Sequence, residues 1–131
     1  MSGGAVRAVD TNVLVRLLAR DEARQTELAE AFVAGGAWVS VLALAETIWV
    51  LEAAYGLEPP RLAKAVEMLL DHRHLVLQDA DMVSAALALY RRRPTVGFSD
   101  CLMVEMARKA GHLPIGTFDK ALGRMEGVER L

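Results

Sequence analysis

Five short apolar runs, separated by longer stretches with helical spacing, restrict this chain to an α/β fold. The runs are three to six residues long, and the alternation is typical of units in which parallel strands are joined by helices. We expect strands at Ala5–Val9, Ala37–Val41, Leu75–Leu77, Leu113–Phe118 and Val128–Leu131. Helices are expected to begin at Val13, with Thr11 or Asn12 as the N-cap, and to cover Asp21–Val33, Leu42–Tyr55, Pro59–Leu70, Asp79–Arg92 and Asp100–Ala110. We expect Ser99 to cap the last of these helices and Gly111 to end it.

The chain has the length and composition of one folded domain. It contains 131 residues, of which 53% are hydrophobic and 24% charged. This balance is typical of a folded protein with its own core and excludes a disordered chain. No internal repeat or linker interrupts the pattern, so we predict a single domain over residues 1–131.

Cysteine content and hydropathy indicate a reducing compartment. The only cysteine, Cys101, excludes an internal disulfide framework and a zinc site built from cysteines. No apolar stretch reaches the roughly 18 residues that a membrane span requires. The segment Met1–Arg7 lacks the charged start and apolar run of a signal peptide. We therefore expect a cytoplasmic protein that has no membrane partner.

The net charge gives a first indication against nucleic acid. Seventeen acids and 15 Lys and Arg residues give −2, whereas domains that coat nucleic acid are usually basic. Net charge does not say where the charges lie, so the positions of the acids decide what this value means.

Four acids lie where acids are unusual. Asp10 directly follows the first strand, which we expect to be buried and central, and Asp119 ends the fourth strand. Asp100 opens a helix. Glu46 lies in a helix that is apolar nearly all round and is therefore expected to be buried. Ligands bind beyond the carboxyl ends of parallel strands, and a carboxylate among apolar residues needs a partner or a task.

Simple geometry brings these acids toward one edge of the predicted sheet. The helix from Asp100 runs about 16 Å away from that edge, and the next strand returns about 20 Å to Asp119. Glu46 follows the second strand within about one helical turn, and Asp10 joins them if the strands are parallel. Ionised carboxylates at close range repel, so a cluster of them favours bound cations, and oxygen ligands suit Mg²⁺ or Mn²⁺.

Other interpretations of the same residues stay open. Asp10 could be a turn residue, Asp100 a favourable charge at a helix N-terminus, and Asp119 the start of the following helix. An aspartate-based phosphotransferase or phosphatase with Asp10 as nucleophile is one alternative function, although that pattern expects a second aspartate where this chain has Asn12. A non-catalytic binding module that is stabilised by a metal is another.

The segment from Asp10 to Val15 resembles the first acidic motif of PIN-domain ribonucleases, in particular the VapC-like toxins of bacterial toxin–antitoxin pairs. Three further segments, Ser40–Glu46, Phe98–Leu102 and Gly116–Asp119, resemble the later motifs of that family in the same order. None of the motifs is specific by itself, but the four occur in the expected order, and the resemblance covers essentially the whole chain.

The resemblance implies a three-layer α/β/α fold with a central, mostly parallel sheet of four to five strands. It also implies metal-dependent hydrolysis of RNA, a homodimer, and a small antitoxin protein as partner. The implied catalytic residues, which are also the implied ligands of Mg²⁺ or Mn²⁺, are Asp10, Glu46, Asp100 and Asp119. The residues implied to orient these acids or to contact phosphate are Thr11, Asn12, Ser99 and Thr117.

Sorting the acids by position changes what the net charge implies. If four acids bind metal, 13 of the 17 remain against 15 Lys and Arg residues. The objection to nucleic acid then weakens. Because the excess of positive charge is small, we expect RNA affinity to be modest and to depend on the bound metal.

Overall fold

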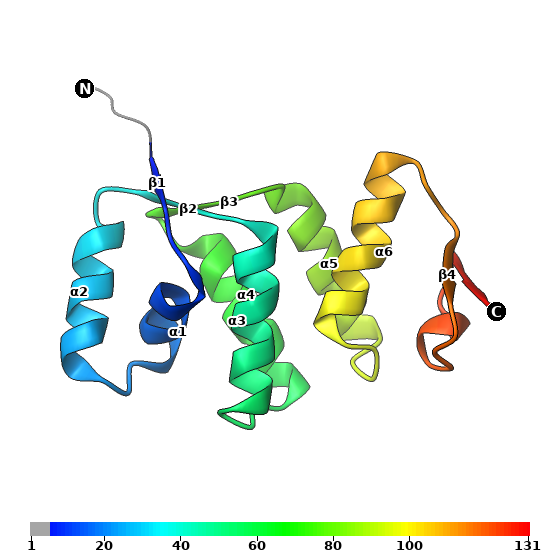
Figure 1. The fold of residues 1–131 in the computed structure, drawn as a ribbon, viewed down its shortest axis with the longest axis horizontal. Coiled ribbons are helices and arrows are strands. Elements are labelled where there is room, and N and C mark those ends of the chain that lie inside the picture. The colour runs from blue at the N-terminus through cyan, green and yellow to red at the C-terminus, as the bar shows by residue number, and fades with distance from the viewer. Residues whose placement is uncertain (1–5) are drawn as a thin grey trace. The chain divides into compact units, whose positions relative to one another are not determined.

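A computed structural model of the chain describes residues 6–131 (Figure 1). Ala5, where the first strand was predicted to start, and most of the segment Met1–Arg7 lie outside the described residues. The chain divides into two compact units, one ending at Ala80 and one covering Asp81–Leu131. That residues 1–131 form a single domain stays a prediction. Within the described part of the chain, no helix combines the length and apolar character needed to cross a membrane.

The first unit contains a three-stranded parallel sheet in the order β1-β2-β3, with Trp38 of β2 paired to Ala8 and to Val76. Helix α1 packs against α2 and α3, and α4 packs against α3 and β3. The elements are β1 (Arg7–Ala8), α1 (Thr11–Ala19), α2 (Ala23–Val33), β2 (Ala37–Val39), α3 (Val41–Ala53), α4 (Pro59–Asp71) and β3 (Leu75–Leu77).

The second unit contains two helices and a two-stranded parallel sheet, in which Ile115 pairs with Val128. Its elements are α5 (Ala80–Arg92), which begins at the boundary, α6 (Phe98–Ala110), β4 (Ile115–Thr117), the short 3₁₀ helix η1 (Leu122–Arg124) and β5 (Val128–Arg130). Gly111 ends α6 as predicted, because it adopts a left-handed conformation with φ of 82°.

The α/β class and the parallel strands are confirmed, but the strands are divided between two sheets. β4 forms its hydrogen bonds with β5, so the larger sheet has three strands. The prediction that the first strand is buried and central is wrong. β1 is an exposed, two-residue edge strand, and the central strand is β2, in which Ala37 and Val39 are buried.

Two predicted helix caps are also wrong. The residue that caps α1 is Asp10 rather than Thr11 or Asn12, because its carboxylate accepts a hydrogen bond from the backbone N–H of Val13 at 3.2 Å. Helix α6 begins at Phe98, after Gly97, so Ser99 lies inside the first turn instead of capping it.

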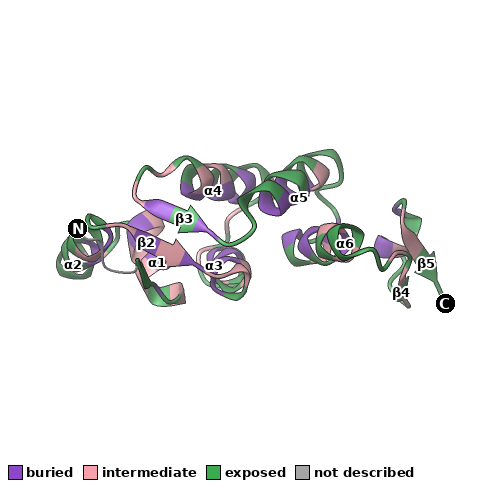
Figure 2. Ribbon diagram, turned by 90° about the horizontal axis from the view of Figure 1, so that it is seen from above, coloured by how far each residue is buried: buried purple, intermediate pink, exposed green. Residues whose placement is uncertain are grey.

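Helix α3 has one buried face and one exposed face, although its sequence is apolar nearly all round (Figure 2). Leu44, Ile48 and Leu51 are buried, whereas Leu42 and Trp49 are 68% and 65% exposed. The prediction of a buried helix is therefore wrong for one side. The reason is that a helix without a polar stripe does not reveal in its sequence which side faces the core.

The two faces of α3 predict different responses to the same substitution. Leu44→Ala should lower the free energy of unfolding by about 2–5 kcal/mol, because it leaves a cavity in the core. Leu42→Ala, on the exposed face, should change it by less than about 0.5 kcal/mol. Guanidinium denaturation of both variants measures the difference, and equal losses would contradict the orientation of α3.

Candidate metal and catalytic site

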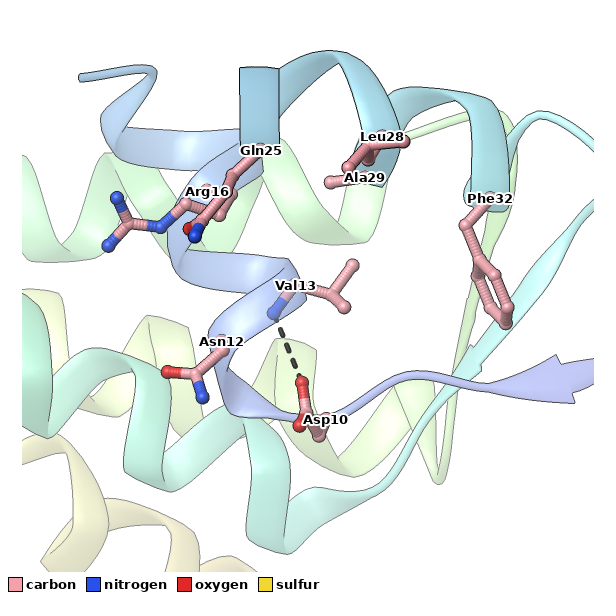
Figure 3. Close-up of a pocket in the computed structure, with 8 residues that line it drawn as sticks. All are labelled: Asp10, Asn12, Val13, Arg16, Gln25, Leu28, Ala29 and Phe32. Carbon is pink, nitrogen blue, oxygen red and sulfur yellow. Dashed lines mark hydrogen bonds between the residues drawn. The ribbon is translucent and has the colours of Figure 1, made fainter. Parts of the chain in front are cut away.

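Asp10 lies at the junction where β1 ends and α1 begins. Its backbone is extended, and its Oδ1 atom accepts the hydrogen bond from Val13 that starts the helix (Figure 3). The positive end of the helix dipole favours a negative charge here. The carboxylate is exposed and keeps further lone pairs, so it can cap the helix and bind another ligand.

Glu46 is joined to this junction by Thr11. The Thr11 hydroxyl donates a hydrogen bond to Oε1 of Glu46 at 3.3 Å, across 35 residues of sequence. Glu46 is exposed, so the expectation that it is buried is wrong. We call Asp10, Thr11 and Glu46 the first acidic cluster.

Two hydrogen bonds fix the start of α3 and thereby the position of Glu46. The Ser40 hydroxyl accepts from the backbone N–H of Ala43 at 3.0 Å, and the Gln78 side chain accepts from the N–H of Val41 at 2.8 Å. Sequence reasoning missed Gln78. The signal that could have found it is its place directly after β3, since polar residues at the carboxyl ends of parallel strands often serve a site.

Asp10 and Asn12 line an open pocket of about 600 Å³ between α1 and α2 (Figure 3). Its far side comes from α2, and the guanidinium of Arg7 lies 3.9 Å from the ring centroid of Phe32. The other lining residues are Val13, Arg16, Gln25, Leu28, Ala29 and Phe32. The pocket thus offers space beside the first acidic cluster, with the Asn12 amide at its edge.

Arg16 lines the same pocket, but its guanidinium is held by structural contacts. It donates to Asp21 at 2.9 Å and to the Tyr55 hydroxyl at 3.1 Å, and that hydroxyl donates to Asp21 at 2.9 Å. The three side chains form a closed triangle that connects α1, the loop after it and the residues following α3.

Asp100 and Asp119, both in the second unit, interact electrostatically. Asp100 lies half-buried in the first turn of α6, and burial, followed by the charge of Asp119, raises its pKa. Asp119 is held at both ends, because its N–H donates to the Thr117 hydroxyl at 3.0 Å and its carboxylate accepts from the N–H of Leu122 at 2.7 Å. We call Asp100, Thr117 and Asp119 the second acidic cluster, which Ser99 borders as an exposed residue.

The chemistry of these donors fits a hard divalent cation. Both clusters offer only carboxylate and hydroxyl oxygens, which Mg²⁺ and Mn²⁺ prefer. Burial is the larger cause of the raised pKa of Asp100, and the negative charge of Asp119 adds to it. A bound cation would offset both effects, because it stabilises the ionised carboxylates. Among the described residues, no group of three or more His, Cys, Asp or Glu side chains is arranged to hold a metal. That all four acids share one rim stays a prediction.

Comparison with known proteins identifies the family. The PIN domain family matches residues 7–128. This chain belongs to the PIN domain family. The resemblance inferred from the four acidic motifs is thereby confirmed, and the match extends through both compact units.

A solved structure resembles this PIN domain over nearly its whole length. The chain is similar to the crystal structure of VapC20 from Mycobacterium tuberculosis, a sarcin-ricin loop cleaving toxin, at 20% identity and a TM-score of 0.42. That similarity covers 95% of this chain and 98% of the other. A search of curated proteins found no match.

The pairing of Asp100 with Asp119 can be tested by titration. Asp119→Asn should lower the pKa of Asp100, because removing the neighbouring negative charge makes ionisation of Asp100 easier. Carboxyl-carbon NMR of the metal-free protein across acidic pH measures this change, with Glu126→Gln as the control. An Asp100 pKa that is the same in Asp119→Asn as in the native protein would refute the contact.

Proposed function

We propose that this PIN-domain protein is a metal-dependent endoribonuclease and the toxin of a toxin–antitoxin pair. The observation that carries the proposal is the association of the candidate acids across the sequence. Thr11 joins Glu46 to the segment that begins at Asp10, and Asp119 acts on Asp100. Together with membership of the PIN family, these two associations favour hydrolysis of an RNA phosphodiester over the alternatives.

Mg²⁺ or Mn²⁺ is the proposed cofactor, and its ligands are Asp10, Glu46, Asp100 and Asp119. When bound, such an ion supplies a water of lowered pKa and positive charge for the reacting phosphate. Hydrolysis by this chemistry requires no covalent intermediate on the protein.

The neighbouring residues position these carboxylates and the substrate. The Thr11 hydroxyl holds one oxygen of Glu46 and leaves the other to bind a ligand. Thr117 holds the backbone of Asp119. Asn12 in the pocket beside Asp10, and Ser99 beside Asp100, offer donors to phosphate oxygens.

The biological setting is proposed from the resemblance to VapC-like toxins. We propose that the protein forms a homodimer and is inhibited by a small antitoxin protein. Its place would be the cytoplasm, where RNA is the substrate, and the free, buried thiol of Cys101 is compatible with a reducing compartment. Co-purification of a small protein from the native host would support this setting.

A cleavage assay tests the enzymatic claim. Purified protein freed of any partner should cleave an RNA hairpin with Mg²⁺ or Mn²⁺ and not with chelator. Asp10→Asn, Glu46→Gln, Asp100→Asn and Asp119→Asn should each lower the rate by at least about 100-fold, because each removes a ligand charge. Glu27→Gln and Glu126→Gln, exposed acids outside the clusters, should cleave like the native protein.

Other outcomes of the same assay would support different functions. Cleavage without metal, or by Asp10→Asn at the native rate, would contradict the proposal. Stable transfer of phosphate to Asp10 would indicate the aspartate-based phosphotransferase. Binding of RNA and metal without turnover would indicate a non-catalytic module.

The role of Thr11 has a separate prediction. Thr11→Val removes the donor to Glu46 and should weaken Mg²⁺ activation by about 10- to 100-fold. Thr11→Ser keeps the hydroxyl and should stay near the native value. Cleavage rates measured across Mg²⁺ concentrations provide the comparison, and equal behaviour of the two variants would show that the bond has no functional role.

A further inference from the structure

The exposed aromatic side chains of this protein lie next to the acidic clusters. The chain has two Trp, two Tyr and three Phe residues, and all seven are among the described residues. Five are buried or half-buried, and only Trp49 and Phe118, at 65% and 81%, are exposed. Trp49 follows Glu46 by three residues, and Phe118 directly precedes Asp119.

Trp49 lies on the same side of α3 as Glu46. Residues three apart in a helix are neighbours on its surface, and both side chains are exposed. The core contacts of α3 come from its other side, where Leu44 and Ile48 are buried. The indole is therefore not needed to fill the core, and it lies beside a candidate catalytic carboxylate.

Phe118 is held in place although its ring is exposed. On one side, the carbonyl of Thr117 accepts from the N–H of Leu131 at 2.7 Å. On the other, the N–H of Asp119 donates to the Thr117 hydroxyl at 3.0 Å. These bonds position the backbone of Phe118, so the ring is presented to solvent from an ordered site beside Asp119.

We propose that Trp49 and Phe118 are stacking platforms for unpaired bases of the RNA substrate. This inference rests on the proposed nuclease function. Stacking on an aromatic ring contributes to binding whatever the base and needs no positive charge. It would supply affinity that 15 Lys and Arg residues against 17 acids do not provide.

The surroundings of the rings favour RNA over a protein partner. Each ring has a carboxylate within three residues, and Phe118 is followed by Asp119 and Lys120. A dry protein interface would have to desolvate these charges, whereas a nucleotide presents a flat base to the ring and a phosphate to the metal. In duplex RNA the base faces are already stacked, so only unpaired bases are available.

Binding of RNA to ring variants tests the proposal. In an Asp10→Asn background that prevents cleavage, Trp49→Leu and Phe118→Leu should each weaken binding of a 12-nucleotide single-stranded RNA by about fivefold to a hundredfold. Trp49→Phe and Phe118→Tyr keep a ring and should retain most of the affinity. Met68→Ala, exposed on α4, is the control and should bind like the background.

Two further probes separate stacking from charge. The affinities for a duplex and for an abasic strand of the same length should be equally weak in the ring variants and in the background. With Trp38→Phe, Trp49 becomes the only tryptophan, and the single-stranded RNA should quench its fluorescence while the abasic strand does not.

The stacking proposal and the nuclease proposal can fail separately. If Trp49→Leu and Phe118→Leu bind single-stranded RNA as tightly as the Asp10→Asn background does, the rings are not stacking platforms. A change of oligomeric state in those variants, measured by light scattering, would instead assign the rings to a protein interface. Metal-dependent cleavage that is insensitive to the rings refutes stacking and leaves the nuclease intact. Ring-dependent RNA binding, combined with no cleavage by protein that keeps Asp10, refutes the nuclease and leaves the stacking sites.

Discussion

The first acidic cluster depends on helix caps at the carboxyl ends of two neighbouring strands. Asp10 caps α1 after β1, and Ser40 caps α3 after β2. Because β1 and β2 are paired in parallel, the two helices start from the same edge of the sheet. The hydrogen bond between Thr11 and Glu46 then needs only the first residue of α1 and the first two turns of α3. Local capping and strand pairing thus place side chains that are far apart in sequence.

The sequence predicted the order and type of the main elements because each is marked by local signals. Leu75–Leu77 was predicted with its observed bounds, and Gly111 ends its helix as expected. Apart from the two helix caps, which are local, the errors concern properties set by tertiary contacts. The edge position of β1 depends on which strands find partners. The exposed face of α3 depends on what packs against it, and its sequence carries no polar stripe to indicate this.

The candidate site was predictable as a set of residue types and only partly as a geometry. The motifs supplied the candidate acids, and in the structure Thr11 donates a hydrogen bond to Glu46 and the charge of Asp119 acts on Asp100. The hydrogen bonds that hold the candidate acids in position were harder to predict. Gln78 acts through a backbone N–H, and Asp10 serves as both cap and candidate ligand, so neither role is visible from residue type or spacing.

The triangle of Arg16, Asp21 and Tyr55 has a consequence for how mutations in this protein should be interpreted. It ties α1 to the chain just beyond α3, while Thr11 and Glu46 tie the same two helices near their starts. The separation of Asp10 from Glu46 is therefore set partly by a network that contacts neither of them. Under the proposed nuclease function, loss of Arg16 would lower activity by altering the spacing of the candidate acids, although Arg16 itself would not take part in the reaction.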